Sequence, residues 1–255
     1  MAEVPGLFAT RPILGVNVAV SSCDTVVERC LTWAQARESR TLCFSTVHMI
    51  MEAVDDPAFL HRLNSIDIVN PDGVPLVWAL GALGARGAQR VYGPDITVLM
   101  LEAAEKARIP VGFFGGSQRV LNALVATVRA KHPRLNIAYQ ESPPFRAMTE
   151  EEDQAVIDRM TASGTRLLFV GLGCPKQENW LVEHAGKVPA VMLAVGAAFD
   201  FLAGAKPQAP RWMMRCGLEW LFRLLTEPRR LARRYLKNNP RFVVKFLRQL
   251  LAGQG

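Results

Sequence analysis

Residues 167–178, which read LLFVGLGCPKQE, decide the fold of this chain. Four large apolar residues, Leu167–Val170, end in a glycine-rich turn, and polar residues that suit the first turn of a helix follow. A continuous apolar run is typical of a strand that is buried on both faces, as in a parallel sheet. The run Val191–Val195 has the same character. The stretch therefore predicts a strand, a turn and a helix of an α/β protein.

On both sides of this unit, short apolar runs alternate with longer stretches in which apolar residues recur at the spacing of a helix. The expected strands are 13–18, 41–47, 66–70, 111–115, 135–139, 167–171 and 191–196. The expected helices are 24–37 with Asp24 as its cap, 95–108, 117–131, and 149–163 behind a capping box of Thr149 and Glu152. This alternation predicts an α/β fold, Rossmann-like, with a mostly parallel sheet and helices on both faces.

The pattern changes after residue 205, where no further strand is expected. We divide the chain into a catalytic body, residues 1–205, and a basic helical C-terminal appendage, residues 206–255. Three short helices are expected in the appendage, at 210–225, 227–238 and 240–251. Thr226 and Asn239 would cap the last two, with Pro228 and Pro240 in their first turns.

The charge is distributed unevenly along the chain. The appendage holds 12 Lys or Arg and 2 Asp or Glu, hence +10, whereas the other 205 residues hold 18 and 21, hence −3. A basic segment of this kind binds an anionic partner: a phosphorylated ligand, an acidic lipid or a nucleic acid. A solvated helix face is the alternative explanation.

Composition and missing motifs exclude several classes of protein. Half of the residues are apolar, which excludes a disordered chain. Five cysteines without a CxxC pair argue against a disulfide framework or a zinc site and indicate a reducing cytosol. We expect neither a signal peptide nor a membrane-spanning helix. No P-loop, HExxH, GxSxG or GxGxxG motif is complete, and His61, His132 and His184 are expected at the surface or at helix ends.

Polar and small residues follow the expected strands, and ligands of a parallel α/β sheet bind beyond the carboxyl ends of its strands. These segments are 45–48, 70–73, 115–117, 171–178 and 196–200. Asp72, in a Pro-Asp-Gly turn, is placed to act as a general base, although an Asx turn would also explain it. Asp200 interrupts an apolar run and needs a partner for its charge. Asp55 and Asp56 look like a solvated helix end, so we expect no metal site.

In these segments the sequence resembles the WecG/TagA/CpsF family of bacterial glycosyltransferases. The resemblance extends from about residue 14 to 236. The matching segments are 46–48 (TVH), 71–73 (PDG), 90–95 (RVYGPD), 171–178 (GLGCPKQE), 196–200 (GAAFD) and 217–224 (GLEWLFRL).

The resemblance implies a peripheral enzyme at the cytoplasmic face of the bacterial inner membrane. Such an enzyme moves a sugar from a UDP-sugar to a sugar on undecaprenyl diphosphate, inverts the anomeric centre and needs no metal or other cofactor. It implies Asp72 as the catalytic base and Thr46 as a second catalytic residue. The substrate-binding residues that it implies, together with those expected from their strand-end positions, are His48, Arg90, Gly171, Lys176, Gln177, Asp200, Arg223, Arg230 and Arg233.

One departure leaves the sugar open. His48 stands where the family often has Asn, so the donor is UDP-glucose or UDP-N-acetylmannosamine, for an exopolysaccharide, a teichoic acid or a common antigen. The expected partners are the two sugar substrates and an anionic membrane surface, not nucleic acid, with a homo-oligomer left open. One alternative is a nucleic-acid-binding protein, whose affinity for DNA or RNA should fall steeply as salt rises. The other is a nucleotide-cofactor oxidoreductase, which the missing glycine fingerprint disfavours.

Overall fold

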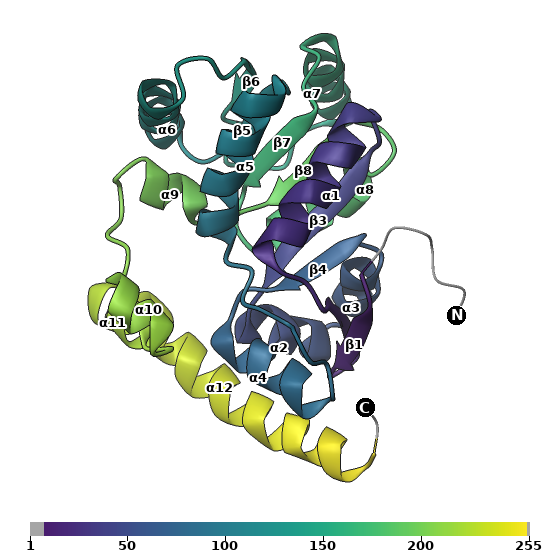
Figure 1. The fold of residues 1–255 in the computed structure, drawn as a ribbon, viewed down its shortest axis with the longest axis vertical. Helices are drawn as coiled ribbons and strands as arrows, with labels where there is room; N and C mark the ends of the chain where they lie inside the picture. The colour runs from purple at the N-terminus through teal and green to yellow at the C-terminus, as the bar shows by residue number, and fades with distance from the viewer. Residues whose placement is uncertain (1–7, 254–255) are drawn as a thin grey trace.

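The computed structural model describes residues 8–253, except the side chains of Arg215 and Arg230. Its core is a sheet of six parallel strands in the order β4-β3-β8-β7-β5-β6 (Figure 1). The strands are β3 (Arg40–Ser45), β4 (Ile68–Pro71), β5 (Val111–Gly115), β6 (Ile137–Glu141), β7 (Leu167–Gly171) and β8 (Val191–Ala194). β7 is buried up to its final glycine and β8 is buried throughout, as their apolar runs predicted. The predicted α/β, Rossmann-like fold is confirmed.

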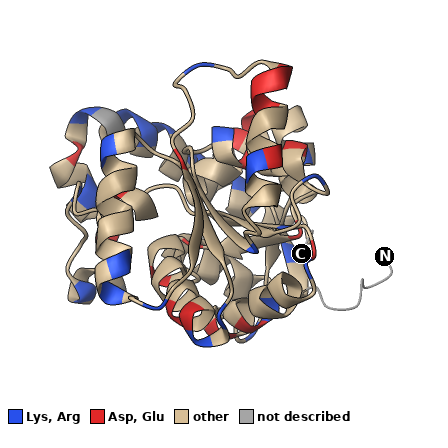
Figure 2. Cartoon of the chain, turned by 90° about the horizontal axis from the view of Figure 1, so that it is seen from above, with Lys and Arg blue, Asp and Glu red and all other residues tan. Residues whose placement is uncertain are grey.

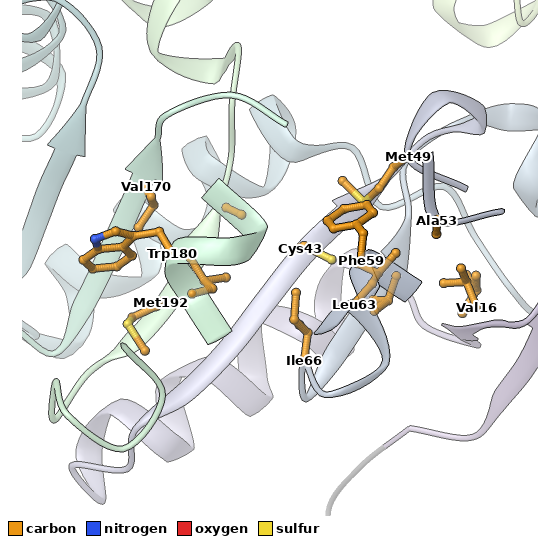
Figure 3. Packing of buried hydrophobic residues seen from close by; sticks show 14 of the residues in the cluster. Val16, Cys43, Met49, Ala53, Phe59, Leu63, Ile66, Val170, Trp180 and Met192 are labelled. Carbon is orange, nitrogen blue, oxygen red and sulfur yellow. The ribbon is translucent and has the colours of Figure 1, made fainter. Parts of the chain in front are cut away.

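Helices cover both faces of this sheet. One face carries α1 (Cys23–Gln35), α5 (Gly93–Ala107), α6 (Gln118–Lys131) and α9 (Ala198–Leu202). The other carries α2 (Val47–Asp55), α3 (Pro57–Asn64), α4 (Val74–Ala82), α7 (Glu150–Ala162) and α8 (Lys176–His184). On this second face, Phe59 and Leu63 of α3 point toward Met49 of α2 and Cys43 of β3 (Figure 3).

Several local predictions were right and others were wrong. The capping box of Thr149 and Glu152 begins α7, as expected, and the helix predicted at 117–131 is α6, with Ser117 as its cap. The first helix is capped by Ser22 rather than by Asp24, because the Ser22 hydroxyl accepts from the backbone of Thr25 and Thr25 bonds back. β6 lies two residues further along the chain than predicted.

The strand predicted at 13–18 is a hairpin outside the main sheet. Its strands are β1 (Thr10–Ile13) and β2 (Val16–Ala19), which pair antiparallel. Leu14 and Gly15 both have positive φ, 49° and 90°, which is the backbone of a two-residue hairpin turn. One apolar run therefore folds back on itself instead of joining the parallel sheet.

The appendage contains α10 (Arg211–Arg215), α11 (Glu219–Thr226) and α12 (Pro228–Leu251). Gly217, with φ 72°, separates α10 from α11, where one helix was predicted. Conversely, the two helices predicted at 227–238 and 240–251 are one, and Asn239 is not a cap. Pro240 is tolerated inside α12 because it lies on the exposed side, where water can reach the carbonyl that its missing N–H leaves free.

α12 packs along α2 and reaches the β1–β2 hairpin (Figure 1). Phe242 and Phe246 are buried in the same core as α2 and α3. The Arg241 guanidinium forms two hydrogen bonds, of 2.9 and 2.5 Å, with the Asp55 carboxylate. The neighbouring Asp56 is the N-cap of α3. The Asp55–Asp56 pair therefore lies where α2 ends and α3 begins, and the Asp55 carboxylate also anchors α12.

The outward side of α12 combines basic and apolar residues. From Pro228 to Leu251 the sequence holds eight Lys or Arg and no acidic residue. Figure 2 marks the basic and acidic residues along the whole chain. The exposed apolar residues on it are Leu236, Val243, Val244, Leu247 and Leu251. Among the described residues, no helix is both long and apolar enough to cross a bilayer.

We expect Phe242→Ala to loosen α12. The ring is 5% exposed, so its loss should lower the free energy of unfolding by about 3 kcal/mol and speed hydrogen exchange across 228–251. Denaturant unfolding and amide exchange measure the two effects. Val244→Ala, on the exposed side of the same helix, is the control, and equal effects of the two variants would contradict the packing described here.

Candidate active site

The ends of β3 and β4 bring two predicted site residues together. The N–H of Asp72 donates to the carbonyl of Ser45, at 2.9 Å, so Asp72 lies beside Thr46. A Cβ on Gly73, the residue after Asp72, would lie 3.9 Å from the Cα of Thr46, which is an ordinary van der Waals contact between the two loops. Thr46 is the N-cap residue of α2, yet its hydroxyl makes no capping hydrogen bond. The hydroxyl is therefore free to face a ligand.

The Asp72 carboxylate is held by two long hydrogen bonds. The backbone N–H of Gly93 donates to Oδ2 and Nη2 of Arg90 to Oδ1, both at 3.3 Å. Burial raises the pKa of Asp72 to about 6; Arg90 opposes this rise and the negative charge of Glu219 supports it. At neutral pH the carboxylate is ionised, yet basic enough to accept a proton from a substrate.

Arg90 is fixed from several sides. Its Nε donates to the backbone carbonyl of Asp72, and its guanidinium lies 4.2 Å from the ring centroid of Tyr92. Its Nη2 also donates to Oε2 of Glu219, in the appendage, at 2.6 Å. The Arg90 side chain is only 20% exposed. One cation thus joins the turn after β4 to the first turn of α11.

A cavity of about 240 Å³ opens over these residues, which we call the base pocket. Five predicted site residues line it: Thr46, His48, Asp72, Arg90 and Arg223. The appendage closes it with residues that the sequence analysis did not name as site residues: Glu219, Trp220, Arg234, Tyr235 and Asn238. The pocket therefore lies between the carboxyl end of the sheet and the C-terminal helices.

His48 lies in the first turn of α2, on the wall of the base pocket. Its Nδ1 is 3.1 Å from Nδ2 of Asn238 and 3.4 Å from Oε1 of Glu52. Burial, and then the charges of Arg234 and Lys237, lower the pKa of His48 to about 4. The imidazole is therefore neutral at pH 7 and offers the pocket a hydrogen-bonding group without charge.

Gly171 and Lys176 line a second cavity, of about 500 Å³, at the ends of β5 and β7. We call it the strand-end pocket. The loop 143–149, with an 88% exposed Phe145, forms its opposite wall. Gly115 has φ 121°, and a Cβ there would lie 2.6 Å from the backbone of Gly171. Only glycine lets these two strand ends approach so closely.

Three other predicted site residues, Gln177, Asp200 and Arg233, are not among the residues that line the two pockets. Gln177 is 4% exposed and braces the ends of β7 and β8, with hydrogen bonds to Gly173, Glu178 and Ala194. Asp200 pairs with Lys206 at 2.8 Å, so this carboxylate has the partner that its apolar surroundings demanded. Arg233 is exposed on α12, and the side chain of Arg230 lies outside the described residues.

His184 is the last residue of α8, which agrees with the expected helix-end position, but it is not at the surface. His184 is 1% exposed, with Nδ1 2.7 Å from the carbonyl of Trp180 and Nε2 3.0 Å from Asp153. Its isolation in the sequence concealed a partner on another helix.

Glu219 was missed although a signal existed. It is one of only two acidic residues in an appendage of charge +10, and it is 8% exposed. An acidic residue among so many cations, in an apolar context, indicates a specific partner. Among the described residues, no group of three or more His, Cys, Asp or Glu could hold a metal ion.

An α/β fold with pockets beyond the carboxyl ends of its parallel strands is typical of enzymes that bind nucleotide-linked substrates. The sequence model of the Glycosyl transferase WecG/TagA/CpsF family matches residues 11–255, and the chain belongs to this family. Of the three classes that the sequence left open, this membership selects the glycosyltransferase.

Two curated relatives share one name, N-acetylglucosaminyldiphosphoundecaprenol N-acetyl-beta-D-mannosaminyltransferase. The one from Bacillus spizizenii is 27% identical over 242 residues, which cover 94% of this chain and 91% of the relative. The one from Staphylococcus aureus is 27% identical over 236 residues, with 91% and 90% covered.

The raised pKa of Asp72 should be visible in the stability of the protein. Between the ordinary value, 3.8, and about 6 the native protein keeps a proton that the unfolded chain has lost. The free energy of unfolding should therefore fall as pH rises from 4 to 6.5, by about 2–3 kcal/mol relative to Asp72→Asn. Urea unfolding of both proteins across this range measures the difference.

A carboxyl ¹³C resonance that is missing from Asp72→Asn identifies Asp72 by NMR and should titrate near pH 6. A stability difference that does not change with pH, together with titration near 4, would show that the carboxyl is not desolvated.

Proposed function

We propose that this enzyme moves a hexosyl group from a UDP-sugar to the sugar of a polyprenyl-diphosphate-linked acceptor, with inversion of the anomeric centre. The observation that carries the proposal is the Asp72 carboxylate, with its raised pKa, on the wall of a pocket that also holds three arginines. The shared name of the relatives supports an acceptor in which the sugar is linked to undecaprenol through a diphosphate.

Asp72 is the general base of this proposal. An acceptor hydroxyl attacks the anomeric carbon while its proton passes to Asp72, and the bond from that carbon to the donor diphosphate breaks. A base with a pKa near the working pH is the most effective. The hydroxyl of Thr46, next to Asp72 and without a capping bond, would orient the attacking hydroxyl.

Arginines are proposed to stabilise the leaving diphosphate. Arg223 lines the base pocket, and its Nε is buried there without a hydrogen-bond partner. A buried guanidinium N–H without a partner carries a desolvation cost that a phosphate oxygen would remove. Guanidinium also matches phosphate geometry. We therefore propose that transfer needs no metal ion.

The strand-end pocket is proposed to hold the nucleoside end of the donor. Gly116 and Gly171 line it without side chains that would narrow it, Lys176 contributes a positive charge, and Phe145 offers an exposed ring for a base. β7 lies three strands from β4, or about 14 Å away at the usual strand spacing. An extended nucleoside-diphosphate sugar bridges such a distance and brings its anomeric carbon toward Asp72.

The donor sugar follows from the relatives rather than from the pocket. Their name makes N-acetylmannosamine the first candidate, with N-acetylglucosamine on the acceptor, and UDP-glucose the second. The neutral His48, held near Asn238, is the residue that we propose to contact the sugar whose identity is in question.

The outward side of α12 is proposed to lie on the cytoplasmic surface of the inner membrane. Basic residues near an anionic leaflet contribute about 1 kcal/mol each, and apolar residues between them enter the headgroup region. The exposed basic residues are Arg229, Arg233, Lys237, Lys245 and Arg248. They alternate with the exposed apolar residues of the same helix.

A transfer assay tests the proposed function. Purified protein, UDP-sugars and a short-chain polyprenyl-diphosphate N-acetylglucosamine should yield a disaccharide lipid and free UDP, detected by mass spectrometry. Asp72→Asn should lower turnover by about 10²–10⁴-fold through loss of the base, while EDTA should leave the wild-type rate unchanged. Activity that EDTA abolishes and Mg²⁺ restores would refute the metal-free proposal, and a variant with wild-type turnover would refute the role of Asp72.

Membrane binding is tested by removing apolar residues from the outward side of α12. Val244→Asn with Leu247→Asn should reduce co-sedimentation with acidic liposomes at least fivefold by removing apolar surface that the interface buries. Folding should persist, because the two residues are 49% and 52% exposed. Val98→Asn, 41% exposed on α5, is the control. Unchanged binding by the double variant would place the contact elsewhere.

A further inference from the structure

Arg90 is shared between two carboxylates that come from distant parts of the chain. Its Nη2 lies 2.6 Å from Oε2 of Glu219 and 3.3 Å from Oδ1 of Asp72. The shorter contact is with Glu219, in the appendage, and not with the nearer residue in sequence. The other oxygen of Glu219, Oε1, lies 4.0 Å from Nη1 of Arg223, which is four residues later on the same helix.

The burial of Glu219 makes this contact more than a surface ion pair. Only 8% of the residue is exposed, and a buried carboxylate is costly unless it is paired. A glutamate in the first turn of α11 also suits the helix dipole, but that effect needs no burial. The helix dipole therefore does not account for the burial of Glu219, whereas its ion pair with Arg90 does.

Without Glu219, the guanidinium of Arg90 would have Asp72 as its carboxylate partner. The Nε of Arg90 already bonds to the backbone of Asp72, so a small rotation would close the fork on the carboxylate. Arginine and carboxylate form two parallel hydrogen bonds when geometry allows. The oxygen that must accept a substrate proton would then be occupied.

We propose that Glu219 is a positioning residue that draws Arg90 away from a full ion pair with Asp72, so that the base is available only while α11 is docked on the body. This inference rests on the proposed role of Asp72 as base. It gives the appendage a part in the chemistry that is distinct from membrane contact: the appendage supplies the negative charge that keeps the base free.

The charges around Asp72 set the direction of the effect. Arg90 precedes α5, and Gly93, whose N–H faces Asp72, is the first residue of α5. Glu219 and Arg223 lie on α11. His48 of α2 and Arg234 of α12 line the same pocket, and His48 is neutral at pH 7. Glu219 is the anion that supports the raised pKa of Asp72 against Arg90 and Arg223. Its neutralisation should lower that pKa.

The test is Glu219→Gln, which keeps the shape and removes the charge. The acidic limb of the pH profile of kcat/KM should move about one unit lower, because the full charge of Arg90 then acts on Asp72. A weaker and occupied base should lower kcat roughly tenfold, with KM for the donor nearly unchanged. Glu219→Asp should restore part of the rate. Glu102→Gln, an exposed change of the same charge on α5, is the matched control.

A purely structural role predicts a different result. If Glu219 only fastens α11, Glu219→Gln lowers the rate and the melting temperature but leaves the acidic limb at its wild-type pH, and the proposal is wrong. Unchanged activity also overturns it. Circular dichroism of the glutamine and aspartate variants shows whether each folds.

An NMR titration of Asp72 in the ligand-free protein separates this inference from the proposed function. If the wild type transfers no sugar, the proposed function fails, yet a pKa of Asp72 that falls in Glu219→Gln still supports the competition for Arg90. A pKa equal to that of the wild type overturns the competition even when transfer is observed.

Discussion

The guanidinium of Arg90 connects the parts of this molecule on which the site depends. It bonds to the turn after β4 through Nε, to the Asp72 carboxylate and to Glu219 through Nη2, and it stacks on Tyr92. A charge this buried is stable only if its donors are satisfied. The turn after β4 and helix α11 must therefore keep their positions relative to each other. A shift of either would leave at least one ion without a partner.

The parallel sheet makes this register possible. Because β3 pairs with both β4 and β8, three carboxyl ends lie side by side, and the loops after them face the same space. Farther along the sheet, Gly115 and Gly171 let the ends of β5 and β7 approach without a side chain between them. Two pockets at one edge of the sheet are the result, one built around Asp72 and the other around Gly171.

The appendage is bound by apolar packing and an ion pair at each end. Near the active site, Glu219 of α11 pairs with Arg90, and Phe222 packs against the cluster of Tyr92, Ala209 and Met214. Farther along, α12 is held by Phe242, Phe246 and the Arg241–Asp55 pair. The Glu219–Arg90 pair is mostly buried, so salt screens it much less than an exposed ion pair.

The sequence by itself determined the α/β class, the strands of the sheet and the positions of the loops that follow them. Leu167–Val170 and Val191–Val195 are apolar throughout because both faces of a parallel strand are covered, so their pattern was sufficient. Family resemblance and strand-end position also selected Asp72, Thr46, His48, Arg90 and Arg223, which do share one pocket. Their catalytic and binding roles stay predictions.

Only the tertiary structure decided which charges meet. Glu219 and Arg90 are 129 residues apart, and no local pattern relates them. The hairpin at Leu14–Gly15 and the unbroken helix through Pro240 also escaped local reasoning, because the first depends on two positive φ angles and the second on which side of the helix faces water. Local sequence sets propensities over a few residues, whereas the pairing of buried ions is set by how distant segments pack together.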